Sequence, residues 1–166
     1  MTSAVNTRAV TARRSLHFEN MDDLAAEVER LETSADRIRP LGNWSAAQVF
    51  QHLGKFIEFS FDGFPFRYGW AIRMACWVLR QISWRWLVAL SFRPGFRNPA
   101  VAAALEPDPA VKSETAGPYL RRQIERIRHG ERMTQPSPAE GPITHEQWVY
   151  AHLRHAELHL SFLLIE

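Results

Sequence analysis

Histidines recur near the C-terminus at a spacing that places them along one side of a helix. At about 100° per residue, His152, His155 and His159 fall on one face of a helix that begins at Thr144. His155 and His159 are four residues apart, so both imidazole rings can reach one point beside the helix. This is the spacing that a metal ion needs from two ligands on one helix. The pattern therefore favours a metal centre.

A fourth histidine lies far upstream, in a segment that also has the pattern of a helix. Ser45 and Gln48 form the pattern of a capping box, which predicts that the helix begins there. His52 then shares a face with three apolar residues, Val49, Phe56 and Phe59. A polar ring in such surroundings must find a partner or lose solvation free energy. Two packed histidine helices would build a three-nitrogen site with open coordination positions.

A structural role for these histidines is the alternative. One histidine on an apolar face is more often a core residue bonded to a carbonyl oxygen than a metal ligand. Four on two faces are harder to explain in this way, because each needs its own buried acceptor and their protonated forms repel one another. Short histidine patterns also recur by chance, so the spacing alone leaves both interpretations open.

Two longer motifs carry a family resemblance. Residues 41–53 read LGNWSAAQVFQHL and residues 58–65 read EFSFDGFP. With the Pro-Asp pair at 107–108 and the histidine-rich last helix, they resemble the DinB-like superfamily, and within it a bacterial family of uncharacterised proteins. The likeness runs from about residue 15 to the end of the chain. Each motif is weak alone, but all occur in the expected order.

The resemblance implies a four-helix bundle that binds a divalent metal through three histidines. Matched residue by residue, these are His52, His155 and His159. His152 is an additional histidine one turn earlier, and the second histidine that the family often has beside the last ligand is replaced by Leu158. Three neutral imidazoles suit Zn²⁺, Ni²⁺ or Fe²⁺.

The resemblance also implies an enzyme that acts on a small molecule, either a thiol-dependent transferase or a hydrolase. A low-molecular-weight thiol is then the expected partner. A hydrolase would need a carboxylate beside the metal as general base, and Asp62, just past the His52 helix, is a better candidate than Glu58 or Glu157, which point away from the histidine faces. Ser60 lies nearer the His52 face and is a candidate for binding the substrate or for supporting a metal ligand. Their structural alternatives are a bond from Ser60 back to the helix and a cap of the Asp-Gly turn by Asp62.

Composition excludes several classes of protein. The chain has 166 residues, 46% of them hydrophobic, as expected of one compact domain. A net charge of +2 is too small to indicate nucleic-acid binding. No apolar stretch approaches the ~20 residues of a membrane span, and no apolar leader follows Arg13 and Arg14, so a cytoplasmic location is expected. The single Cys76 excludes an internal disulfide and is predicted to be a core residue.

The coarse organisation is all-α. We expect a flexible N-terminal segment at residues 1–15 and a single DinB-like bundle domain at 16–166. Helices are predicted at about 20–38, 45–62, 68–90, 110–130 and from 144 onwards, with a long loop at 94–109 that contains a short helical turn at 100–105. We expect this turn to form a short extra helix between the third helical region, 68–90, and the fourth, 110–130. No strand is expected.

The 68–90 helix has two apolar faces, which a small bundle cannot both bury. The face predicted to join the core comprises Ile72, Cys76, Leu79, Trp86 and Leu90. The opposite stripe comprises Trp70, Arg73, Trp77, Arg80 and Trp84. Cover by the 94–109 loop or by a second subunit is favoured over an anionic membrane, because lysine-rich flanks are missing. A non-enzymatic binding or interaction protein that uses this stripe, with a metal or without one, is the alternative function.

Overall fold

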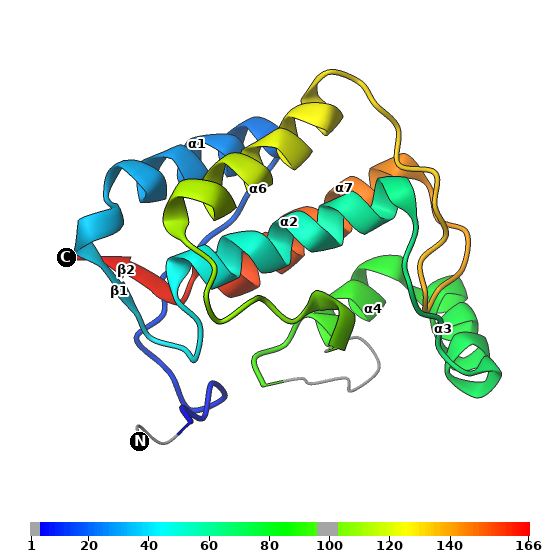
Figure 1. Ribbon diagram of the computed structural model, residues 1–166. Coiled ribbons are helices and arrows are strands. Elements are labelled where there is room, and N and C mark those ends of the chain that lie inside the picture. The colour runs from blue at the N-terminus through cyan, green and yellow to red at the C-terminus, as the bar shows by residue number, and fades with distance from the viewer. Residues whose placement is uncertain (1–3, 96–102) are drawn as a thin grey trace.

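Four long helices pack around one core in the computed structural model, which describes residues 4–95 and 103–166 (Figure 1). They are α1 (Met21–Thr33), α2 (Ala46–Asp62), α6 (Ser113–Arg128) and α7 (His145–Leu160). Both α1 and α2 contact α6 and α7. The described chain is therefore mostly helical, as the sequence predicted.

Local sequence determines where the two histidine helices begin. The Ser45 hydroxyl accepts a hydrogen bond from the Gln48 backbone N–H, and the Gln48 side chain accepts one from the Ser45 N–H. Thr144 and Gln147 make the same reciprocal pair at the start of α7. Each capping box satisfies two backbone donors that the helix itself leaves unpaired, so the predicted helix starts are confirmed.

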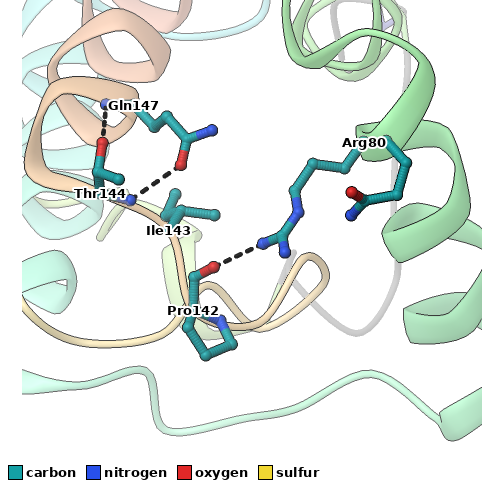
Figure 2. Close-up of a pocket in the computed structure, with 6 residues that line it drawn as sticks. Arg80, Pro142, Ile143, Thr144 and Gln147 are labelled. Atoms are coloured by element: carbon teal, nitrogen blue, oxygen red, sulfur yellow. Dashed lines mark hydrogen bonds between the residues drawn. The ribbon is translucent and has the colours of Figure 1, made fainter.

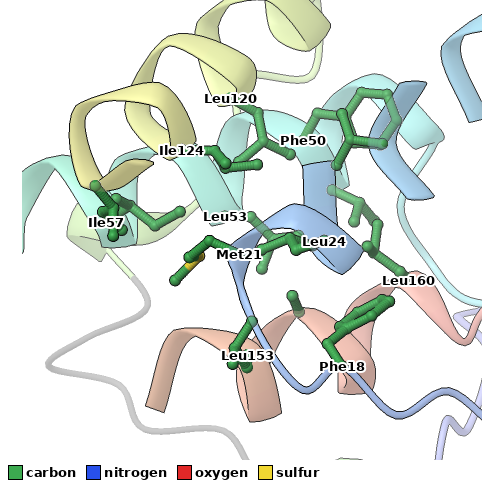
Figure 3. Packing of buried hydrophobic residues seen from close by; sticks show 14 of the residues in the cluster. Phe18, Met21, Leu24, Phe50, Leu53, Ile57, Leu120, Ile124, Leu153 and Leu160 are labelled. Carbon is green, nitrogen blue, oxygen red and sulfur yellow. The ribbon is translucent and has the colours of Figure 1, made fainter. Parts of the chain in front are cut away.

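The core lies between these helices and is filled by their apolar stripes. Figure 3 shows side chains from all four helices converging, among them Leu24, Phe50, Leu53, Leu120, Ile124 and Leu160. All of these side chains are buried. Burial of this apolar surface is the main force that holds α2 and α7 in a fixed relation to each other.

Close packing between α2 and α6 depends on Gly54. A Cβ atom placed on Gly54 would lie 2.5 Å from Cε1 of Tyr119. The Tyr119 hydroxyl in turn donates a hydrogen bond of 2.7 Å to the Glu58 carboxylate, so the ring is held in position. The missing side chain at residue 54 is what lets the two helices approach.

We expect Gly54→Ala to lower the free energy of unfolding by about 1–3 kcal/mol, the usual cost of overpacking a well-filled core. The gain in helix propensity, about 1 kcal/mol, offsets only part of the strain. Urea denaturation of wild type and variant measures the difference. Gly42→Ala is the control, since a Cβ there would make only ordinary van der Waals contact with Phe162, at 3.6 Å, and it should change stability by less than about 0.5 kcal/mol. Equal midpoints for the two variants would contradict this account.

A short antiparallel sheet was not predicted. β1 (Ile38–Pro40) pairs with β2 (Leu163–Ile165), with Ile38 opposite Ile165. The first helix, α1, ends at Thr33 and not at Ile38 as predicted, because Ile38 belongs to β1. A 3-10 turn at Ala35–Arg37 connects the two elements. Three-residue strands are too short to show an alternating pattern, which explains the error.

The segment before α1 also contacts the C-terminal region. Arg14 donates hydrogen bonds to the Glu27 carboxylate at 2.6 Å and to the Leu160 carbonyl oxygen at 3.0 Å. The domain boundary at residue 15 stays a prediction.

The predicted 68–90 helix is interrupted. It consists of α3 (Trp70–Ile82) and α4 (Trp84–Ser91), separated by Ser83 in an extended conformation. The Ser83 hydroxyl accepts a hydrogen bond from the Trp86 N–H and so caps α4. Because the direction of the helix changes here, one wheel drawn across both halves misplaces the faces.

The expectation for the core face of this segment needs correction, and cover of the opposite stripe by the 94–109 loop or by a second subunit stays a prediction. Ile72 and Trp86, predicted to be core residues, are exposed, and Cys76 is only partly buried. Trp70, Arg73 and Trp77 of the opposite stripe are exposed, whereas Arg80 and Trp84 are partly buried, so the described residues cover the stripe only in part. Residues 96–102, in the middle of the loop that was expected to cover the stripe, lie outside the described residues. The first part of the predicted helical turn at 100–105 falls among them, and its remaining residues, 103–105, are helical. No described helix is both long and apolar enough to cross a bilayer.

Candidate metal centre

Three of the predicted histidines meet between α2 and α7. One ring nitrogen from each of His52, His155 and His159 lies within 4.8 Å of the other two. The closest pair is His52 Nε2 and His155 Nε2, at 3.1 Å. Two imidazole nitrogens bound to one tetrahedral Zn²⁺ at 2.0–2.1 Å are separated by about 3.4 Å, so this pair is close to the spacing of two ligands.

The outer nitrogen of His52 is held by backbone. His52 Nδ1 lies 2.9 Å from the carbonyl oxygen of Leu105, to which it donates a hydrogen bond. In the neutral ring this leaves the lone pair on Nε2, which faces the other histidines. A carbonyl partner on the far nitrogen is the usual way in which proteins orient a metal-binding histidine.

The segment that supplies this carbonyl is attached to α2 by its neighbours. Lys55 donates to the Glu106 carbonyl oxygen at 2.8 Å, and the Gln51 side-chain oxygen accepts from the Asp108 N–H at 2.6 Å. Residues one turn from His52 therefore fix the loop that orients its ring.

His155 is the most enclosed member of the group. Its ring is buried, and its Nδ1 has no hydrogen-bond partner among the described residues. His159 keeps partial exposure and lies parallel to the indole of Trp44, with 5.4 Å between ring centroids. His159 and Trp44 are therefore the parts of the group nearest to solvent.

Aromatic rings form the walls of the centre. The Phe92 ring stacks on His155 and the Phe56 ring meets it edge-on, both with centroids 4.7 Å away. Trp44 packs on His52 at 4.7 Å. These walls exclude water and lower the local dielectric constant, which strengthens the interaction of the nitrogen lone pairs with a cation.

Burial keeps the histidines neutral. Burial lowers the pKa of His52 to about 4, although the hydrogen bond to the Leu105 carbonyl acts in the opposite direction. The pKa values of His155 and His159 are lowered well below 6.5, first by burial and then by neighbouring histidines. Neutral imidazole is the form that binds metal ions.

His152 is not part of the three-histidine group. Its Nε2 donates to the Ser60 hydroxyl at 3.1 Å, and Ser60 in turn donates to the Ile57 carbonyl oxygen at 2.5 Å. Ser60 thus bonds back to its own helix, which is the structural role that the sequence left open for it. Both side chains are buried, and His152 stacks on Trp148 with 5.4 Å between ring centroids.

The nearby carboxylates have other partners. Asp62 pairs with Arg126 on α6 at 3.1 Å and is not brought to the histidines. Glu58 accepts from Tyr119, and Glu157 accepts from the Phe18 N–H at 2.6 Å. Within the described residues, the three-histidine group contains no carboxylate.

Sequence reasoning did not identify Trp44, Phe92 or the Leu105 carbonyl as parts of the centre. Trp44 stands directly before the helix cap and belongs to the motif at 41–53, so its position was a usable signal. Phe92 was assigned no role, and any backbone carbonyl can accept a bond. No pattern in the sequence marks these two.

The comparisons identify a family but no function. Residues 10–165 match DUF1569, a family of proteins of unknown function. Neither the curated proteins nor the solved structures contain a significant match to the chain.

Proposed function

We propose a function from the site itself, because the chain belongs to the DUF1569 family and that family has no known function. The proposal is that His52, His155 and His159 bind one divalent cation and that a small molecule, most simply a low-molecular-weight thiol, takes an open coordination position. The observation that carries it is the convergence of three ring nitrogens within 4.8 Å of one another.

The residues present fit such an ion. The donors are three imidazoles with lowered pKa values, one of them oriented by the Leu105 carbonyl. A His155 ring bound through Nε2 would leave its proton on Nδ1. Without an ion, the His155 Nε2–H would donate to His52 Nε2 across the 3.1 Å between the two atoms, so a bound cation would replace this hydrogen bond.

The resemblance to the DinB-like superfamily supports the same assignment. The motifs at 41–65 resemble that superfamily, and the three histidines occupy the positions that the resemblance implies. The packing of α1, α2, α6 and α7 is compatible with a four-helix DinB-like bundle.

Within that superfamily resemblance, the surroundings favour a transferase over a hydrolase. When bound, a divalent cation stabilises a thiolate or polarises a bond. Hydrolysis also needs a general base, and Asp62, Glu58 and Glu157 are all engaged elsewhere. The protein's part is then to exclude water with Phe56 and Phe92 and to admit substrate beside His159.

A second function rests on a different observation. The exposed tryptophans of α3 favour an interaction protein in which the histidine centre has a structural role. This alternative predicts either metal binding without any response to thiols or no metal binding at all.

Titration with Co²⁺ followed by a thiol tests the proposal. The measurement uses Cys76→Ser protein, so that the added thiol is the only one present. We expect visible absorption of four- or five-coordinate cobalt at one ion per chain, then a thiolate-to-cobalt charge-transfer band when glutathione or β-mercaptoethanol is added. Cobalt binding that no thiol perturbs would reject the transferase and leave the structural metal. Absence of cobalt binding would reject the transferase and leave an interaction protein without a metal.

A further inference from the structure

The outward face of α3 is apolar and has no partner within the described chain. Trp70 is 80% exposed and Ile82 is 75% exposed, while Met74, Trp77 and Val78 are each about half exposed. In a helix these residues occupy one broad arc. A contiguous apolar patch of this kind marks an interaction surface.

The orientation of α3 is fixed from its other side. Arg80 donates a hydrogen bond of 2.5 Å to the carbonyl oxygen of Pro142 (Figure 2). It donates a second one, of 3.2 Å, to the carbonyl oxygen of Glu140. Leu79 and Cys76, on the same side as Arg80, are partly buried. Figure 1 shows α3 at the edge of the molecule, beside the loop that leads to α7. The apolar face is thus directed outward.

The segment that carries this face is uniformly basic. Residues 63–95 contain five arginines and none of the chain's 18 acidic residues. Arg67 and Arg73 are exposed at the N-terminal end of α3, and Arg85 is exposed on α4. The other 133 residues contain 15 basic and 18 acidic side chains, so the positive charge is local to this segment.

This combination argues against a symmetric dimer through α3. A two-fold contact places the same patch of both subunits in the interface. The arginines of one segment would then face the arginines of the other, and neither segment has a carboxylate to pair with them. Like charges brought together in this way cost several kcal/mol.

We propose that this face binds the surface of a bilayer that contains anionic lipids. Tryptophan is enriched where acyl chains meet headgroups, and arginines at the rim contact lipid phosphates. A helix of 13 residues is about 20 Å long, too short to cross a bilayer but suited to lie in its surface. The α3 face then brings the whole molecule to the membrane. This inference differs from the cover by the 94–109 loop or by a second subunit that the sequence favoured, and it is independent of the metal centre.

Vesicle sedimentation tests the proposal. The full chain is mixed with vesicles of phosphatidylcholine alone or of an equal mixture with phosphatidylglycerol. We expect binding only to the anionic vesicles, a blue shift of tryptophan emission, and weaker binding at high salt. Trp70→Ser/Ile82→Ser should weaken binding at least about tenfold. Arg67→Ala/Arg73→Ala should weaken it about thirtyfold, at the usual contribution of each basic residue near an anionic surface.

Matched controls separate the face from net charge and from misfolding. Arg122→Ala/Arg132→Ala removes two exposed charges outside the segment and should change affinity less than about threefold. Circular dichroism checks that each variant keeps its helices. Three outcomes would overturn the proposal: no binding of wild type to anionic vesicles, equal losses in the two arginine pairs, or a dimer in light scattering that Trp70→Ser/Ile82→Ser converts to monomer. The last would identify a second copy as the partner.

Discussion

His159→Ala should abolish stoichiometric metal binding. Three ligands from two helices hold the proposed ion, and removal of one leaves a site with two nitrogens. We expect its affinity for the metal ion to fall at least about a hundredfold, because the loss of a residue that only supports a ligand already costs about 10- to 100-fold. His159 is the least enclosed of the three rings, so its truncation disturbs the core least. Equilibrium dialysis against Zn²⁺ with elemental analysis measures the ion content. We expect one ion per chain in wild type and none retained by the variant.

Two other histidines serve as controls. His152→Gln removes a buried ring whose Nε2 is bonded to Ser60, and His129→Ala removes an exposed one. Both variants should keep the ion. Added Zn²⁺ should also raise the melting temperature of wild type, because ligand at a hundred times its Kd stabilises the folded state by about 2.7 kcal/mol. A full complement of zinc in His159→Ala would show that the ion lies elsewhere.

The histidine pair on α7 was predictable because helix geometry is local. Residues four apart share a face in any helix, and the Thr144 capping box indicates where that helix begins. His52 was predictable in the same way from the Ser45 box and its apolar face. That the two helices would pack with these faces together came from the family resemblance, since no local pattern encodes which helices are neighbours.

The surroundings of the centre depend on contacts between distant parts of the chain. Leu105 is 53 residues from His52, and its role is that of a backbone carbonyl, which every residue has. Phe92 reaches His155 only because the helix breaks at Ser83 and α4 packs on α7. A serine within an apolar run gives no clear signal for such a break, and with the break undetected the faces of α3 were assigned incorrectly.

Acid should destabilise the metal-free protein, and His152 should account for a measurable share. Its ring is buried, and burial lowers its pKa from 6.5 to about 3. Below pH 6.5 the unfolded chain therefore takes up a proton that the folded chain excludes, so the free energy of unfolding falls as the pH falls. The slope for one such group is about 1.4 kcal/mol per pH unit, which amounts to about 2–3 kcal/mol between pH 7 and pH 4.5.

Urea denaturation in EDTA at those two pH values measures this loss in wild type and in His152→Gln. A glutamine cannot be protonated, so the variant should lose about 2–3 kcal/mol less than wild type over the same range, whatever its stability at pH 7. The comparison of slopes separates titration from lost packing against Trp148 and Phe56, because packing does not depend on pH. Equal slopes in the two proteins would mean that His152 is protonated in the folded state. The Ser60 hydroxyl, which donates to the Ile57 carbonyl, could still accept a hydrogen bond from Nε2 of the protonated ring. The second N–H, on Nδ1 of His152, would however be buried without an acceptor among the described residues.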